Sequence, residues 1–304
     1  MSKIAWIGTG VMGKPMAGYL AKAGHELRLF NRTFVKAEKA VAEYGDSVNA
    51  KAFDNILEAI DDADYIFSIV GYPRDVESVL SGPNGVIQNA KKGAIVVDMT
   101  TSSPELAEKL YSEGKEHDVK VLDAPVSGGD SGARNGTLTV MVGGDEDAYL
   151  ETKDLFELMG STINYMGKAG NGQHTKAANQ IAVAGATAAY TEALVYALKV
   201  GLDPEEMLRA VGGGSAASWQ LQNMAPRALE HDFDPGFFVK HFIKDMKIAK
   251  SEIEKQGIEL NMLNVVLQTF EDFAAKGHED EGTQALIRNY LADDEIKKSD
   301  KSDK

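Results

Sequence analysis

The sequence predicts an α/β fold, with an N-terminal doubly wound parallel sheet followed by an all-α C-terminal domain. Three observations carry this prediction. Short apolar runs alternate with helical patterns through the first half of the chain, a glycine-rich turn joins the first run to the first helical pattern, and no strand-like run follows Gly170. With 304 residues, the chain is long enough for two domains and a large core.

The glycine-rich turn has the spacing G-x-G-x-x-G and lies between the apolar run Ile4–Ile7 and the helical stretch Met16–Ala23. In this context the first glycine permits the turn, the second lets phosphates approach the backbone, and the third lets the helix pack against the strand. Glycine turns also arise for steric reasons alone, but the flanking strand and helix favour a Rossmann-like dinucleotide site. The predicted cofactor contacts in this loop are Gly8, Gly10, Val11, Met12 and Gly13.

The next elements follow from apolar runs separated by helical patterns. Further buried parallel strands are predicted at Leu27–Phe30, Tyr65–Val70, Ile95–Asp98 and Val119–Asp123. Crossover helices are predicted at Phe34–Tyr44, Asn55–Ile60 and Glu105–His117, the last with Ser103 as its N-cap and Pro104 at its first position. Leu138–Val142 and Ile163–Met166 are predicted as additional strands. We therefore assign residues 1–166 to a Rossmann-like dinucleotide-binding domain.

Residues 167–292 are predicted to form a helical domain for substrate binding and oligomerisation. It begins with one long helix, Gly172–Lys199, and a second helix starts after the cap Asp203. Later helices are predicted at Phe242–Lys255, Met262–Lys276 and Thr283–Leu291. The long helix is rich in alanine, so we expect it to pack against a second subunit in a homodimer or homotetramer; burial within one subunit is the alternative. The charged residues 293–304 are expected to be disordered.

The composition limits the classes of molecule that this protein could bind. A formal net charge of −14 argues against nucleic acid, and the absence of cysteine excludes disulfides and thiolate nucleophiles. The longest low-polarity stretch, Ile181–Ala189, is far shorter than the ~20 residues that span a bilayer, so we expect a cytoplasmic protein without a membrane partner. We predict no metal site, because the histidines show no metal-ligand spacing. Dinucleotides and organic acids are anions, so an acidic protein needs local positive charge where it binds them. Arg32, Lys176 and Lys244 are the candidates for this charge.

The end of the second strand bears on cofactor choice. An NAD site places an acid about 20 residues past the glycines to bind the ribose 2′-hydroxyl, whereas here the strand runs into Asn31, Arg32 and Thr33. A guanidinium suits a 2′-phosphate because it stays charged and binds oxyanions through two N–H groups. We therefore predict NADP, with NAD as the second choice; the alternative is that Arg32 is an ordinary surface residue.

Two further segments could carry chemistry. After the strand that ends at Asp123, Ser127 offers a hydroxyl, and Gly128 and Gly129 offer unshielded N–H groups for a small carboxylate, unless this is only a structural turn. Lys176 and Asn179 are three residues apart on the long helix and share a face. Burial near a helix N-terminus is expected to lower the pKa of Lys176 toward the roughly 7–8 that suits proton transfer.

Together these motifs resemble the β-hydroxyacid dehydrogenase family, which includes 3-hydroxyisobutyrate dehydrogenases, tartronate semialdehyde reductases and glyoxylate/succinic semialdehyde reductases. The resemblance covers nearly the whole chain. It rests on the glycine loop with Pro15, the segments Asp123–Gly129 and Gly170–Gln180, the stretch from Ser218 through Asp232–Phe237, and the pair Lys244-Asp245.

The resemblance implies roles for single residues. Lys176 would be the general acid/base, Ser127 with the two glycines would hold the carboxylate, and Thr101, Val70 and Lys244 would contact the cofactor. Some members have a second asparagine where this chain has Gln180, which leaves open whether Asn179 or Gln180 touches the substrate. Phosphogluconate dehydrogenases carry histidine at the position of Asn179, which argues against that activity.

The predicted function is therefore an NAD(P)-dependent oxidoreductase that interconverts a small β-hydroxy acid and its semialdehyde, as a 3-hydroxyisobutyrate dehydrogenase does. A glyoxylate/succinic semialdehyde or tartronate semialdehyde reductase is the alternative. An imine reductase is disfavoured because that class usually has another residue at the position of Lys176. A cofactor-binding module without catalysis is disfavoured because both the lysine and the carboxylate cradle are present.

Overall fold

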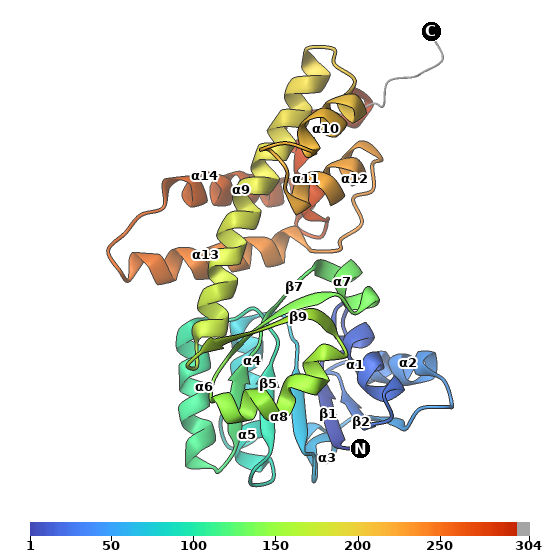
Figure 1. The fold of residues 1–304 in the computed structure, drawn as a ribbon, viewed down its shortest axis with the longest axis vertical. Coiled ribbons are helices and arrows are strands. Elements are labelled where there is room, and N and C mark those ends of the chain that lie inside the picture. Colours follow the sequence, from blue (N-terminus) through green and yellow to red (C-terminus); the bar gives the residue numbers. More distant parts are fainter. Residues whose placement is uncertain (297–304) are drawn as a thin grey trace. The chain divides into compact units, whose positions relative to one another are not determined.

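The computed structural model describes residues 1–296, which divide into two compact units, Met1–Lys176 and a second unit that begins at Ala177. The first unit is an α/β domain and the second is helical (Figure 1). The fold class predicted from the sequence is confirmed. The division falls inside α9 (Asn171–Lys199), so Lys176 is the last residue of the first unit.

The first unit is built on a nine-stranded sheet in the order β3-β2-β1-β4-β5-β6-β8-β7, with β9 pairing β8. The strands are β1 (Lys3–Ile7), β2 (Glu26–Phe30), β3 (Ala50–Phe53), β4 (Tyr65–Ser68), β5 (Ile95–Asp98), β6 (Lys120–Asp123), β7 (Val126–Ser127), β8 (Leu138–Gly143) and β9 (Gly160–Gly167). The first six pair in parallel, and β8 runs antiparallel to β6 and β7. The chain winds outward from β1 in both directions, so the carboxyl ends of β1 and β4 lie at the switch point where ligands bind in such sheets.

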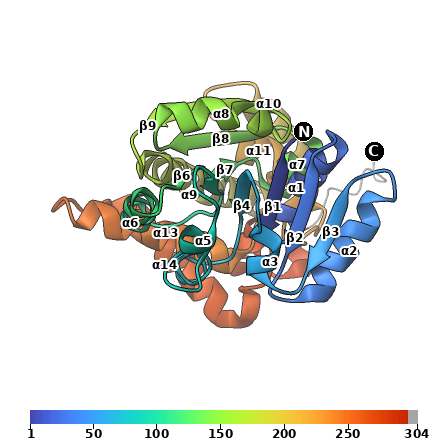
Figure 2. The ribbon, with the colours of Figure 1, turned by 90° about the horizontal axis from the view of Figure 1, so that it is seen from below.

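Helices cover both faces of this sheet (Figures 1 and 2). They are α1 (Gly13–Lys22), α2 (Phe34–Tyr44), α3 (Ile56–Ile60), α4 (Pro73–Leu80), α5 (Val86–Asn89), α6 (Pro104–Glu116), α7 (Gly129–Asn135) and α8 (Glu146–Glu157). Alternate residues of β1 lie in two apolar cores, one on each face of the sheet. Ile4 and Trp6 pack with α1 and α8 on one face, and Ala5 and Ile7 pack with α3 to α6 on the other.

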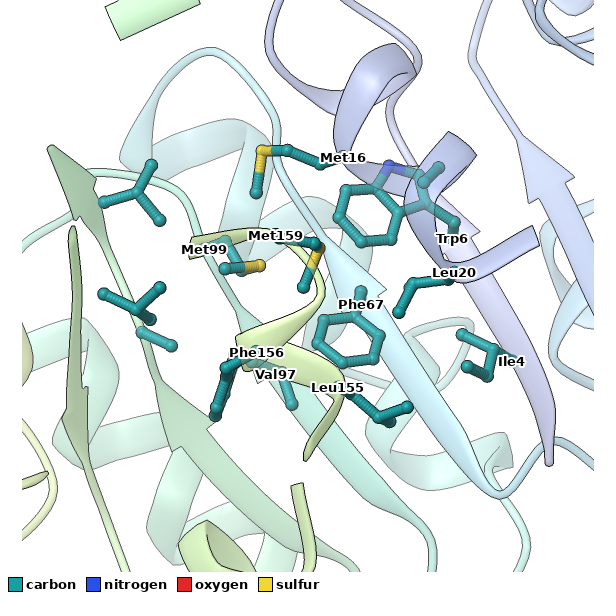
Figure 3. Packing of buried hydrophobic residues seen from close by; sticks show 14 of the residues in the cluster. Ile4, Trp6, Met16, Leu20, Phe67, Val97, Met99, Leu155, Phe156 and Met159 are labelled. Carbon is teal, nitrogen blue, oxygen red and sulfur yellow. The ribbon is translucent and has the colours of Figure 1, made fainter. Parts of the chain in front are cut away.

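Aromatic residues fill the core beneath the glycine-rich turn (Figure 3). Trp6 stacks on Phe67 at 5.4 Å between ring centroids, and Phe67 meets Phe156 edge-on at 6.2 Å. The Trp6 indole N–H also donates to the Gly8 carbonyl oxygen at 2.9 Å. Strand β1 is therefore held rigidly where it enters the glycine loop.

The second unit continues with α10 (Pro204–Gly212), α11 (Trp219–Asn223), α12 (Ala225–Leu229), α13 (Val239–Glu254) and α14 (Asn261–Phe273), followed by one π-helical and two 3-10 segments. The predicted helix Thr283–Leu291 is a 3-10 helix over Thr283–Asn289 rather than an α-helix. Tertiary bonds explain this, because Gln284 donates to the carbonyls of Asp232 and Asp234, and Thr283 N–H donates to that of Phe237.

The predicted disordered tail needs correction at its start. Asp293–Glu295 form a short 3-10 helix and Ile296 is fully buried. Ion pairs from Arg288 to Asp293 and from Lys199 to Glu295 hold this segment. Residues 297–304, which the prediction also includes, lie outside the described residues.

Helix α9 is long and apolar enough to cross a membrane by length and composition alone, with a mean hydropathy of 1.4 over its most apolar window. One such helix is weak evidence, since the core helix of a globular protein passes the same test. Several α9 side chains pack with α13 and α14, among them Ala177, Ile181 and Ala184.

Candidate functional site

The glycine loop between β1 and α1 has the geometry that the motif predicts. Gly8 has a φ of +100°, and a Cβ built there would lie 2.1 Å from the Ile69 carbonyl oxygen. A Cβ on Gly13 would lie 2.0 Å from the Gly8 carbonyl oxygen, so both positions require glycine for the turn itself. Gly10 differs, because a Cβ there would meet no atom within 4 Å.

The N-terminus of α1 fits an anion. Its N-cap residue, Met12, makes no side-chain cap hydrogen bond, and its first turn holds no acidic residue. A helix end of this kind offers N–H groups and the positive end of its dipole. Together with the open space at Gly10, these features fit a dinucleotide pyrophosphate.

The end of β2 lies against this loop through Asn31. The Asn31 Oδ1 accepts from the Thr9 N–H at 3.1 Å, and its Nδ2 donates to the Thr33 carbonyl at 3.0 Å. The neighbouring Arg32 side chain is 92% exposed, with one guanidinium nitrogen 3.9 Å from Asp75 Oδ1. So long an ion pair on the surface contributes little, which leaves Arg32 able to bind a ligand anion.

The ends of β4 and β5 are tied to each other. Asp98 Oδ1 accepts from the Ser68 hydroxyl at 2.9 Å and from the Thr100 N–H at 3.1 Å. The Thr100 hydroxyl in turn accepts from the Val70 N–H at 3.0 Å. These bonds bring the predicted contact Val70 and the segment that carries Thr101 to one edge of the sheet.

The predicted carboxylate cradle follows β6. Ser127 ends the short strand β7 and is half-buried, while Gly128 and Gly129 have φ values of +128° and +62°. A Cβ at Gly129 would meet nothing within 4 Å. The turn therefore demands glycine for its backbone shape and leaves space beside Gly129 for a ligand.

Lys176 lies in the second turn of α9 and is buried, with 6% of its surface exposed. The helix start is capped from another element, since the Asp123 carboxylate at the end of β6 accepts from the N–H groups of Gly170 and Gln173, both at 2.9 Å. Burial raises the pKa of Asp123 to about 6, against the opposing effect of these two N–H groups. Gly172 permits the close approach, because a Cβ there would lie 2.5 Å from the carbonyl oxygens of Asp123 and Met141.

In the second unit, Asn179 and Gln180 belong to a partly buried chain of polar contacts. Asn179 Nδ2 donates to Gln180 Oε1 at 2.7 Å, and Gln180 Nε2 donates to Asp245 Oδ2 at 2.7 Å. Lys244 Nζ lies 2.9 Å from Asp245 Oδ1. Burial and the charges of Lys244 and Lys240 lower the pKa of His241 beside them. The amide of Gln180 is thus occupied on both its oxygen and its nitrogen.

Two residues with clear structural roles, Asp123 and Gln173, were not predicted as site residues. Both lie in the sequence motifs Asp123–Gly129 and Gly170–Gln180, but no local pattern distinguishes a helix-capping carboxylate from a solvated one. Among residues 1–296, no group of three or more His, Cys, Asp or Glu side chains is placed to hold a metal ion.

Comparison with known proteins agrees with this geometry. Residues 3–167 match the family model described as the NAD binding domain of 6-phosphogluconate dehydrogenase, and residues 170–290 match that described as NAD-binding of NADP-dependent 3-hydroxyisobutyrate dehydrogenase. The chain is 47% identical to an uncharacterized oxidoreductase of Bacillus subtilis over 95% of this chain and 98% of that protein. It is 37% identical to the 2-hydroxy-3-oxopropionate reductase of Escherichia coli, over 94% and 96%.

Among solved structures, the chain is similar to the 3-hydroxyisobutyrate dehydrogenase of Mycobacterium tuberculosis determined with L-serine. The TM-score is 0.84 at 30% identity, covering 96% of this chain and 100% of that one. The glycine loop, the family models and these relatives together define an oxidoreductase that uses a nicotinamide dinucleotide, NADP or NAD, and acts on CH–OH groups. Within that class, the chain belongs to the β-hydroxyacid dehydrogenase family.

Proposed function

We propose that this protein interconverts a small β-hydroxy acid and its semialdehyde, with Lys176 as the general acid and base. The observation that carries the proposal is that the Lys176 amine is buried near the capped start of α9, three residues after the helix is anchored to β6. Two of the relatives named above, a 2-hydroxy-3-oxopropionate reductase and a 3-hydroxyisobutyrate dehydrogenase, are named for short acids that bear a hydroxyl or oxo group, which supports this substrate class.

The cofactor would supply the hydride, which moves between nicotinamide C4 and the carbonyl carbon of the substrate. In the reducing direction, Lys176 as an ammonium donates a proton to the forming alkoxide oxygen, and in oxidation the neutral amine accepts it. The residues proposed to hold the cofactor are Gly8, Gly10, Val11, Met12, Gly13, Asn31, Arg32, Thr33, Val70, Thr101 and Lys244.

The substrate would be oriented by its carboxylate and its reacting oxygen. We assign the carboxylate to Ser127, Gly128 and Gly129, where open space lies beside Gly129. For the reacting oxygen of the substrate we favour Asn179 over Gln180, because the amide oxygen of Gln180 is bonded to Asn179 and its amide nitrogen to Asp245. Orientation of this kind supplies much of the rate by making the reaction effectively unimolecular.

A substrate panel tests the proposal. NADPH oxidation would be followed with methylmalonate semialdehyde, succinic semialdehyde, tartronate semialdehyde, glyoxylate and a cyclic imine, and NADP reduction with 3-hydroxyisobutyrate. We expect one of the aldehyde acids to give the highest kcat/KM, and the panel decides between the 3-hydroxyisobutyrate and the reductase activities. Turnover of the imine alone would favour an imine reductase, and no turnover of any compound would favour a non-catalytic cofactor-binding module.

Arg32 is proposed to select NADP. The Arg32→Ala variant should raise the Kd of NADPH by about 10–100-fold, the equivalent of a lost hydrogen bond to a charged group, and leave the Kd of NADH unchanged. Fluorescence titration of both cofactors measures this, with Arg209→Ala on α10 as a control for the loss of an exposed arginine. Equal NADPH affinity in wild type and Arg32→Ala would remove the assignment.

We also propose that the protein is a cytoplasmic homodimer or homotetramer whose subunits contact each other through α9. Small exposed residues recur on one face of this helix, at Ala178, Ala182, Gly185 and Ala189, and lead to the exposed Tyr196. Within residues 1–296, packing does not explain the mid-helix Gly185, since a Cβ there would meet nothing within 4 Å. Close packing against a second copy would explain these residues.

A bulky charge on this face should separate the subunits. Ala182→Arg is expected to elute at the monomer volume in gel filtration at micromolar concentration, whereas wild type and the control Ala210→Arg, an exposed site on α10, elute as oligomers. A wild-type protein that elutes as a monomer would end this part of the proposal.

A further inference from the structure

Gln173 is a buried amide whose two ends are both used. It is 1% exposed, its Oε1 accepts from the Ser102 N–H at 2.9 Å, and its Nε2 donates to the Thr100 carbonyl oxygen at 2.8 Å. These two backbone groups flank Thr101. The Gln173 side chain on α9 is therefore hydrogen-bonded to the backbone on both sides of Thr101.

The same residue is anchored through its own backbone. Its N–H donates to Asp123 Oδ2 at 2.9 Å, which joins it to the end of β6. Thr100 is in turn held by Asp98 at the end of β5 and bonds the Val70 N–H after β4. A continuous path of hydrogen bonds thus runs from the ends of β4, β5 and β6 to the first turn of α9.

Lys176 follows Gln173 by three residues on the same helix, so a shift of this turn moves the amine with it. A displacement of about 1 Å can lower a rate by about 100-fold when a reaction depends on the alignment of two groups. The Gln173 amide is suited to this task because it donates and accepts at once, whereas a carboxylate can only accept.

We propose that Gln173 is a positioning residue that sets the Lys176 amine relative to the Thr101 segment, and so relative to the nicotinamide cofactor. It contacts neither substrate nor cofactor in this assignment. The inference rests on the proposed function, since it presumes that Lys176 transfers the proton and that Thr101 contacts the cofactor.

Gln173→Glu tests the inference because it keeps the size of the side chain. A protonated carboxyl group reproduces both bonds, with O–H donating to Thr100 and C=O accepting from Ser102, whereas a carboxylate faces the Thr100 carbonyl without a donor. The groups that bear on its ionisation are Asp123 on β6 and Asp98 on β5, which oppose it, and Lys176 on α9, which favours it. We expect kcat of the variant to be lowered by about 10–100-fold at pH 8 and to recover toward wild type as the pH falls.

Three further measurements accompany this profile. Thermal unfolding of the cofactor-free variant should show a loss relative to wild type that shrinks at low pH. Gln173→Ala, which makes neither bond, should be slow at every pH. The control Gln88→Glu, at an exposed position on α5, should follow the wild-type profile.

The failures of the two proposals are distinguishable. If folded Gln173→Glu has the wild-type kcat and pH profile, the positioning role is wrong even if the variant is less stable, because a purely structural residue would change stability alone. If Lys176→Ala, measured in parallel, turns over at the wild-type rate, the proposed function is wrong whatever Gln173→Glu does.

Discussion

Lys176→Ala is expected to lower kcat by about 10²–10⁴-fold, the usual contribution of a general acid or base, and to leave the Kd of NADPH close to the wild-type value. The amine would be lost from a buried position where bulk water cannot readily replace it as a proton donor. Cofactor affinity should persist because the proposed phosphate contacts come from the glycine loop and Arg32. Steady-state kinetics and fluorescence titration on the same preparation measure both quantities.

The matched control is Lys168→Ala, which removes an exposed lysine eight residues earlier on the chain. It should keep the wild-type kcat, so that a loss in Lys176→Ala cannot be assigned to net charge. Lys176→Met preserves much of the length and apolar volume of the side chain and should be as slow as the alanine variant. A Lys176→Met enzyme with wild-type kcat would remove the amine from the mechanism.

Periodicity predicts the interior of the sheet well and its edges poorly. Strands β1 and β5 are apolar runs because helices cover both their faces, and α2 matches its predicted bounds, Phe34–Tyr44. The edge strand β3 was missed because Ala50–Phe53 contains an exposed lysine and carries no continuous apolar signal. Strand β7 has only two residues and is defined by its partner β8, not by its own sequence.

The candidate site divides in the same way between local and distant determinants. The glycine loop was predictable because its backbone shape is encoded within six residues. Asn31 was predictable because it directly follows β2, the strand that pairs in parallel with β1. The bond between Gln173 and Ser102 joins residues 71 apart in the sequence, and that between Gln173 and Asp123 joins residues 50 apart. Such contacts arise from tertiary packing, for which a single sequence holds no spacing rule.

Gly8→Ala is expected to destabilise the fold, whereas Gly10→Ala is expected to spare the fold and weaken cofactor binding. At Gly8 a methyl group meets the Ile69 carbonyl at 2.1 Å and the backbone has a φ of +100°, so overlap and strain act together. We expect the free energy of unfolding to fall by about 2–4 kcal/mol. Urea unfolding of the cofactor-free protein measures this loss.

Gly10→Ala separates the turn from the ligand. Its φ lies outside the left-handed range and its Cβ would meet no atom within 4 Å, so the stability of the cofactor-free protein should change by less than about 1 kcal/mol. The methyl group would nevertheless occupy the space through which the pyrophosphate approaches the backbone, and the Kd of NADPH should rise by about 10–100-fold. If Gly10→Ala binds NADPH as tightly as wild type, the pyrophosphate does not approach the backbone at this position. Gly8 would then serve only the turn, and the cofactor contacts assigned to Gly10, Val11 and Met12 would be wrong.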